Sequence, residues 1–160
     1  MDLMNRIICH PLWQDNMQKL KAFEKDRIYC CHGTEHLLDV ARLAYVEVLE
    51  RRLPISREQI YAAALLHDLG RAVQYENGTP HDLAGARLAE TILKDCGVPD
   101  ADREEIILAI SGHRKRQTGE NPNLPGILYR ADKASRLCLF CEARESCNWP
   151  DSKKNLILKG

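Results

Sequence analysis

Histidine and aspartate residues on predicted helices are the side chains best suited to chemistry in this chain. Five of them lie near a helix end or on a helix face, and the sixth, Asp132, lies in the middle of a predicted helix: the set is His36, His67, Asp68, His81, His113 and Asp132. A divalent transition metal needs neutral imidazoles and at least one carboxylate from different elements, because one helix seldom supplies more than two ligands to an ion. Asp132 lies on an otherwise apolar face, where a buried carboxylate needs a cation or a hydrogen-bond partner. The pattern predicts a metal centre that several helices assemble.

The elements that must position these side chains are predicted to be helices. Apolar residues recur at helical spacing in nearly every segment, and no alternating β-branched run indicates a strand. With 160 residues, of which 44% are hydrophobic, the chain has the size of one domain. The predicted fold class is therefore all-α, a single compact bundle of about six to seven helices with an irregular, cysteine-containing C-terminal tail.

Start and stop signals give approximate bounds for these helices. The expected helices cover residues 2–25 with an interruption at Pro11, 31–53, 57–69, 81–96, 102–113 and 125–137. Pro54 stops the second of these regions, and Ser56 with Gln59 forms a capping box for the next. Gly70 and Gly97 are expected to terminate helices. The segments 71–80 and 117–126 are predicted to be loops.

Five segments of the chain resemble, in order, the motifs of the HD-domain superfamily: EHLLDVARLA, AALLHDLGR, HDLAGARLAE, SGHR and YRADK. They span residues 36–136. The resemblance implies one HD domain over residues 1–160, with a motif-bearing core at 31–137 and a tail at 138–160. In that family the first His, the His-Asp pair and a distant Asp bind one metal, which implies His36, His67, Asp68 and Asp132 here.

Two further histidines, His81 and His113, are similar to those of the two-metal subset of the family, in which Asp68 would bridge the ions. This subset resembles the HDIG-type symmetrical diadenosine tetraphosphate hydrolases and, more distantly, the HD-GYP cyclic dinucleotide phosphodiesterases, although the GYP portion is absent. His81 and His113 could instead hydrogen-bond a substrate phosphate above a single ion. His32 lies one helical turn before His36 and either reaches the site or only occupies the first turn.

The resemblance implies a metal-dependent phosphohydrolase that cleaves a phosphoester or phosphoanhydride of a nucleotide or related small molecule. A metal-bound water of lowered pKa would attack phosphorus. Asp68 and Lys133 are the predicted catalytic residues, and Arg71, Arg114 and Lys133 are predicted to bind the substrate. Iron, manganese, zinc, cobalt and nickel all suit such ligands, as one or two ions. Two alternatives remain open: a two-iron oxygenase, and a non-catalytic sensor of metal or redox state.

The tail contains a second cluster of candidate ligands, in the sequence CLFCEARESC. Cys138, Cys141 and Cys147 have a spacing that can surround one tetrahedral zinc ion or an iron–sulfur cluster. A fourth ligand would come from Cys30 or Cys31, and Cys31 is the residue predicted. Reduced cytosolic thiols are the alternative explanation, since the chain has seven cysteines and no evident export signal.

Composition narrows the expected partners. Lys plus Arg and Asp plus Glu both number 23, so the formal net charge is zero and no basic surface for nucleic acid or anionic membrane stands out. No stretch is long and apolar enough for a transmembrane helix. We therefore expect a cytoplasmic protein that binds a small phosphorylated molecule, and neither nucleic acid nor membrane. A homodimer remains open.

Overall fold

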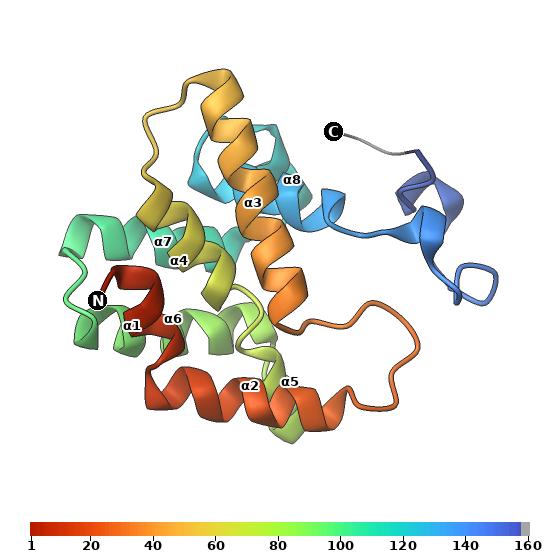
Figure 1. Cartoon of the computed structure of the whole chain (residues 1–160), viewed down its shortest axis with the longest axis horizontal. Coiled ribbons are helices and arrows are strands. Elements are labelled where there is room, and N and C mark those ends of the chain that lie inside the picture. The colour runs from red at the N-terminus through yellow and green to blue at the C-terminus, as the bar shows by residue number, and fades with distance from the viewer. Residues whose placement is uncertain (158–160) are drawn as a thin grey trace.

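The computed structural model describes residues 1–157 and contains only helices within them, which confirms the all-α prediction. The elements are α1 (Leu3–Ile8), α2 (Pro11–Phe23), α3 (Thr34–Arg51), α4 (Arg57–Leu66), α5 (Arg71–Asn77), α6 (His81–Asp95), α7 (Asp100–Gly112), α8 (Leu124–Ala134), and the short 3-10 helices η1 (Arg116–Glu120), η2 (Cys138–Phe140) and η3 (Asp151–Lys153). The α-helices form one bundle, while residues 138–157 lie to one side of it (Figure 1). None of the described helices has the length and apolar character needed to cross a membrane.

The bundle is organised around α3 and α8, which pack against each other and against α4 and α7. Side chains from four helices are completely buried where these elements meet: Leu37, Val40, Leu66, Ile110 and Ile127. Each buried Leu or Ile stabilises the fold by about 1.5–3 kcal/mol. This packing fixes the helix ends, and the helix ends carry the candidate ligands.

The N-terminal helices cover the other side of the bundle. The chain turns at Pro11, as predicted, because proline suits the first position of α2 and its missing N–H costs nothing there. The indole of Trp13 donates a 3.0 Å hydrogen bond to the carbonyl of Leu65 in α4. α2 also packs against α5 (Figure 1).

The segment predicted as a loop at 71–80 contains a helix, α5, so that prediction was wrong. α5 buries Ala72, and Gly78 ends it in a left-handed conformation with φ 80°. Gly70 does not terminate the preceding helix, because α4 already ends at Leu66 and Gly70 has a right-handed backbone before α5. The capping box of Ser56 and Gln59 is confirmed. Gly97 follows the end of α6 at φ 71°, as expected.

Besides α4, two further helices that carry candidate ligands are shorter than expected. The region expected at 31–53 becomes helical only at Thr34, and the last strong helix ends at Ala134 instead of residue 137. Residues 28–33 and 135–137 therefore run as connections on either side of the ligand-bearing helices. One leads into α3, and the other leads from α8 into the tail.

Candidate metal centre

The candidate centre is built where five helices begin or end. α3 carries His36 near its start, and α8 carries Asp132 near its end. His67 and His113 directly follow α4 and α7, while His81 is the first residue of α6. A position at a helix end leaves the side chain free to turn inward, where apolar packing of the same helices shields it from water.

Asp68 lies at the middle of the candidate centre, almost completely buried. Its Oδ2 atom lies 3.3 Å from Nε2 of His36 and 3.2 Å from Nε2 of His67. Its Oδ1 atom lies 3.5 Å from Nε2 of His81 and 3.8 Å from Nε2 of His113. The two oxygens of one carboxylate thus face two different pairs of imidazoles.

Asp132 completes the group on one side. Its Oδ1 atom lies 3.5 Å from Nε2 of His36 and 3.9 Å from Nε2 of His67. Two groups of donor atoms result, each within 4.8 Å and both sharing Asp68: His36, His67, Asp68 and Asp132, and Asp68, His81 and His113. The structure therefore brings together all six residues that the sequence predicted as metal ligands.

Hydrogen bonds at Nδ1 orient the imidazoles of His67 and His113, which follow the ends of α4 and α7. Nδ1 of His67 lies 2.7 Å from the carbonyl of Ala64, and Nδ1 of His113 lies 2.5 Å from the carbonyl of Ile110. A carbonyl can only accept, so Nδ1 of each ring carries the proton and Nε2 presents a lone pair. The rings thereby also satisfy carbonyls that the ends of α4 and α7 leave unpaired.

The other two imidazoles have side-chain partners that the sequence did not reveal. Nδ1 of His81 donates to Oε1 of Gln74 at 2.7 Å. Nδ1 of His36 lies 3.3 Å from the hydroxyl of Ser135, which itself donates to the carbonyl of Asp132 and so accepts from His36. Such outer partners fix the tautomer of a metal-binding histidine. No sequence motif marks Gln74, because its role depends on how α5 packs beside α6.

The donor set fits divalent cations. The Nε2 atoms of all four imidazoles face oxygens of the carboxylate of Asp68. Three of the buried atoms lack any hydrogen-bond partner: Nε2 of His36, Nε2 of His67 and Oδ2 of Asp68. Nε2 of His81 and Nε2 of His113 are only 3.3 Å apart. Cations between these atoms would satisfy all of them, because imidazole and carboxylate are typical ligands of transition metals.

The electrostatics of the centre favour positive charge beside Asp68. Burial lowers the pKa of His36, but the adjacent carboxylates of Asp132 and Asp68 overcome this and raise the pKa to about 9. On the other side, burial and the charge of Arg71 lower the pKa of His81 to about 3. Burial is the largest of the effects that lower the pKa of His113 to about 4. Both of these imidazoles are therefore neutral at neutral pH, as metal binding requires.

Three basic residues lead from the centre toward solvent. Arg71 donates from Nε to Oδ1 of Asp68 at 2.7 Å, and Nζ of Lys133 lies 2.5 Å from Oδ2 of Asp132. Arg114 pairs with Asp82 at 3.2 Å, beside His81. Side-chain exposure rises outward along the series His67 0%, Asp68 1%, Arg71 25%, Lys133 35% and Arg114 50%. An anion entering from this side would meet cations first.

His32 lies at the edge of the centre. Its ring is 5.7 Å from that of His36, and its Nδ1 is 2.6 Å from Oε1 of the buried Glu24. Glu24 also accepts from the backbone N–H of His32 and from the hydroxyl of Tyr75. His32 belongs to neither group of candidate ligands. Its Glu24 pairing joins the connection before α3 to α2 and α5.

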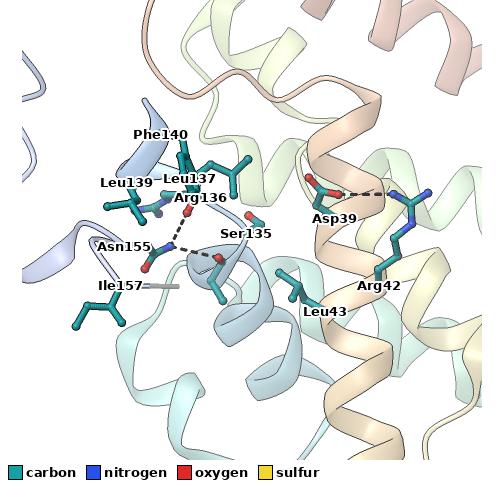
Figure 2. A pocket seen from close by; sticks show the side chains of 11 residues that line it. Asp39, Arg42, Leu43, Ser135, Arg136, Leu137, Leu139, Phe140, Asn155 and Ile157 are labelled. Atoms are coloured by element: carbon teal, nitrogen blue, oxygen red, sulfur yellow. Dashed lines mark hydrogen bonds and ion pairs between the residues drawn. The ribbon is translucent and has the colours of Figure 1, made fainter. Parts of the chain in front are cut away.

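A groove of about 380 Å³ lies away from the centre, between α3, the end of α8 and the tail (Figure 2). Two of its three charged residues, Asp39 and Arg42, pair with each other at 3.6 Å, and the third is Arg136. None of the six candidate ligands lines it, although Ser135 does. We assign the chemistry to the histidine cluster, because the groove lacks converging donor atoms.

The tail cysteines do not group with Cys31. The Cys31 thiol lies 3.4 Å from the carbonyl of Tyr29 and 3.7 Å from that of Arg27, so it points back along its own connection. Within residues 1–157, no three thiols lie within 4.8 Å of one another. Cys138, Cys141 and Cys147 are half-buried in the tail.

A helical bundle that brings imidazoles from four helix ends and the Asp132 carboxylate from a fifth around the shared carboxylate of Asp68 defines an all-α protein with a candidate metal centre. A family model of the HD domain matches residues 33–137, and the chain therefore belongs to the HD domain family. A solved structure of a predicted HD superfamily hydrolase from an uncultured Thermotogales bacterium has the same fold. It superposes with a TM-score of 0.64 over 98% of this chain and 88% of its own, at 21% sequence identity.

Relatives in sequence fall into two groups. An uncharacterised protein of Clostridium beijerinckii is 41% identical over 155 residues, which is 97% of both chains. Ribonuclease Y of Rubrobacter xylanophilus is 34% identical over 101 residues, and Ribonuclease Y of Frankia casuarinae is 36% identical over 78 residues. These matches cover only 17% and 10% of the two ribonucleases. The resemblance to diadenosine tetraphosphate hydrolases stays a prediction, because these relatives do not bear on it.

Proposed function

We propose that this protein is a metal-dependent phosphohydrolase that cleaves a phosphoester or phosphoanhydride of a nucleotide or related small molecule. One observation carries the proposal: the two oxygens of Asp68 face separate pairs of imidazoles. His36, His67 and Asp132 would hold one ion with Asp68, and His81 and His113 would hold a second. When bound, such ions supply a water of lowered pKa and polarise the phosphoryl oxygens.

The remaining residues have roles set by their position. Arg71 holds one oxygen of Asp68 at 2.7 Å, which fixes the orientation of this carboxylate between the two groups. Lys133, paired with Asp132 and 35% exposed, lies where it can donate to a phosphoryl oxygen. Arg114 is farther out and would attract the anionic substrate before it enters.

The experiment is a hydrolysis assay on protein purified without oxygen and supplied with manganese or iron. The substrates are mononucleotides, dinucleoside polyphosphates, cyclic dinucleotides and a short RNA, because the local likeness to Ribonuclease Y makes an RNA phosphodiester a fair challenge to the small-molecule proposal. Released phosphate and nucleotides are measured by chromatography, with Asp68→Asn as the inactive control. We expect turnover of a small nucleotide that the control lacks. Turnover of RNA alone would contradict the proposed substrate class.

If none of these substrates were hydrolysed while metal was bound at the histidine cluster, the hydrolase proposal would be overturned. Substrate-dependent oxygen uptake without phosphate release would assign the centre to oxygenase chemistry instead. Metal or redox binding without any turnover would point to a sensor.

A further inference from the structure

The tail, residues 138–157, keeps a defined conformation without a hydrophobic core. No residue of this segment is buried, and four of its large apolar side chains are exposed: Leu139, Phe140, Trp149 and Ile157. Its attachment to α8 involves Asn155, whose side-chain amide donates to the carbonyl of Lys133. The same amide donates to the carbonyls of Ala134 and Arg136 (Figure 2). So short a segment needs another source of folding free energy, such as a bound metal.

The first part of the tail consists of consecutive turns, each closed by a backbone hydrogen bond between residues three apart in the chain, and the three cysteines lie at the ends of these turns. The N–H of Cys141 donates to the carbonyl of Cys138 at 3.3 Å, and the N–H of Arg144 donates to the carbonyl of Cys141 at 3.1 Å. The N–H of Cys147 then donates to the carbonyl of Arg144 at 3.4 Å. All three cysteines are half-buried in a segment where most other residues are exposed.

The connection before α3 meets the tail at this point. The hydroxyl of Tyr29 donates to the carbonyl of Ser146 at 3.1 Å, which joins the residue before Cys30 to the residue before Cys147. Burial raises the pKa of the Cys30 thiol, and negative charge on Cys138 and Cys141 raises it further, so these thiols lie within electrostatic reach of Cys30. Arg136 opposes this effect on Cys30, as a cation beside thiolates would.

We propose that the thiolates of Cys30, Cys138, Cys141 and Cys147 hold a thiophilic metal centre that fastens the tail to the connection before α3. This centre would be separate from the histidine cluster. It would join the segment that leads to His36 with the segment that follows Asp132. Its role is structural, since no donor atom of a substrate-binding residue is involved.

An iron–sulfur cluster is the occupant that we expect. Both a zinc ion and an iron–sulfur cluster are held by four thiolates. Zinc, at about 2.3 Å from each sulfur, would draw the sulfurs to within roughly 4 Å of one another. No three thiols in the described part of the chain lie within 4.8 Å. The thiols therefore lie farther apart than one zinc ion would hold them, and this favours a cluster, which is wider than a single ion.

The test measures iron, acid-labile sulfide and zinc in full-length protein purified without oxygen from cells supplied with iron. Sulfide and sulfur-to-iron absorption report on the tail alone, because the histidine cluster contains no thiol. We expect acid-labile sulfide, about two per chain for a two-iron cluster or about four for a four-iron cluster, and we expect its loss in Cys30→Ser and in the double variant Cys138→Ser, Cys141→Ser. Cys31→Ser is the matched control and should keep the cluster.

Several outcomes would decide against the proposal. Wild-type protein with neither sulfide nor thiolate-bound zinc would overturn it, as would equal loss in Cys30→Ser and Cys31→Ser. Zinc without sulfide, held only while Cys30 is present, would support the four-thiolate site and reject the cluster as its occupant. Alkylation of the native wild-type protein gives a readout that needs no variant: Cys31 should be labelled while Cys30 is protected, and equal labelling would reject the site.

Discussion

The histidine cluster and the cysteine tail are both sets of candidate metal ligands, but the protein builds them in opposite ways. The six residues of the histidine cluster come from five helices whose apolar faces form the core, and His67 and Asp68 are at most 1% exposed. The cysteines of the tail lie among turns without a single buried side chain. Packing therefore positions the first set before any ion binds, whereas the second set would rely on the proposed metal centre for order.

Loss of the shared carboxylate should have the largest effect. We expect Asp68→Asn to abolish hydrolysis and to empty both ion positions, because this carboxylate faces all four imidazoles and Asn carries no charge. Metal analysis and the hydrolysis assay measure this. Sulfide in the tail should be unchanged. Retention of both ions by the variant would show that Asp68 does not bridge them.

Gly70→Ala should damage the packing that positions the histidine cluster. A Cβ at this position would meet the carbonyl of His81 at 2.1 Å and the backbone nitrogen of Gly85 at 2.3 Å, and neither backbone atom can move alone. We expect a loss of about 3 kcal/mol or more in the free energy of unfolding, measured in urea. Gly33→Ala is the control, because nothing lies within 4 Å of its added Cβ, and should cost less than about 1 kcal/mol. Equal costs would contradict the close contact of α5 with α6.

Gln74→Leu should weaken one ion position and spare the other. The change removes the acceptor of Nδ1 of His81, which then loses its fixed tautomer. We expect the affinity for the ion at His81 and His113 to fall about 10- to 100-fold. Titration of manganese into metal-free protein measures it as a loss confined to one of two binding events. Equal weakening of both events would mean that the two groups do not act as separate positions.

The metal-free protein should be most stable near the ordinary pKa of histidine. The pKa of His36 is raised from 6.5 to about 9, so its stabilisation is complete below 6.5 and is lost as the pH rises toward 9. The pKa values of His81 and His113 are lowered to about 3 and about 4, so the unfolded chain takes up protons first and stability falls as the pH drops below 6.5.

Urea unfolding with a chelator present, across a pH range of about 5 to 9, measures this maximum. His36→Gln should remove the loss on the alkaline side only. A variant that keeps the alkaline loss would assign it to another group.

Substitutions of the tail cysteines should have the smallest effect on the stability of the bundle. The double variant Cys138→Ser, Cys141→Ser should leave the unfolding free energy of the bundle within about 0.5 kcal/mol, because no core residue is touched. Limited proteolysis should at the same time cut within residues 138–157 more rapidly than in the wild type. A bundle that unfolds together with the tail would remove the distinction between the two regions.

Helix periodicity in the sequence predicted most of the fold. Local sequence signals gave the wrong secondary structure where contacts with other helices determine whether a segment is helical. The polar segment RAVQYEN was predicted to be a loop, yet it forms α5 because Ala72 is buried and α2 and α6 pack on either side. Conversely, residues 31–33 and 135–137 have helical periodicity but lie outside helices. A short helix depends on its neighbours more than on its own propensities.

The sequence by itself determined which residues can act as ligands and which helices carry them, because metal chemistry requires particular side chains and amphipathic periodicity is local. Only the tertiary structure decided that Asp68 faces two separate groups, that Gln74 and Ser135 orient two of the imidazoles, and that the connection before α3 meets the tail between Tyr29 and Ser146. These relations join segments that are far apart in the chain. They depend on distances of a few ångströms, which only the packing of one helix against another can fix.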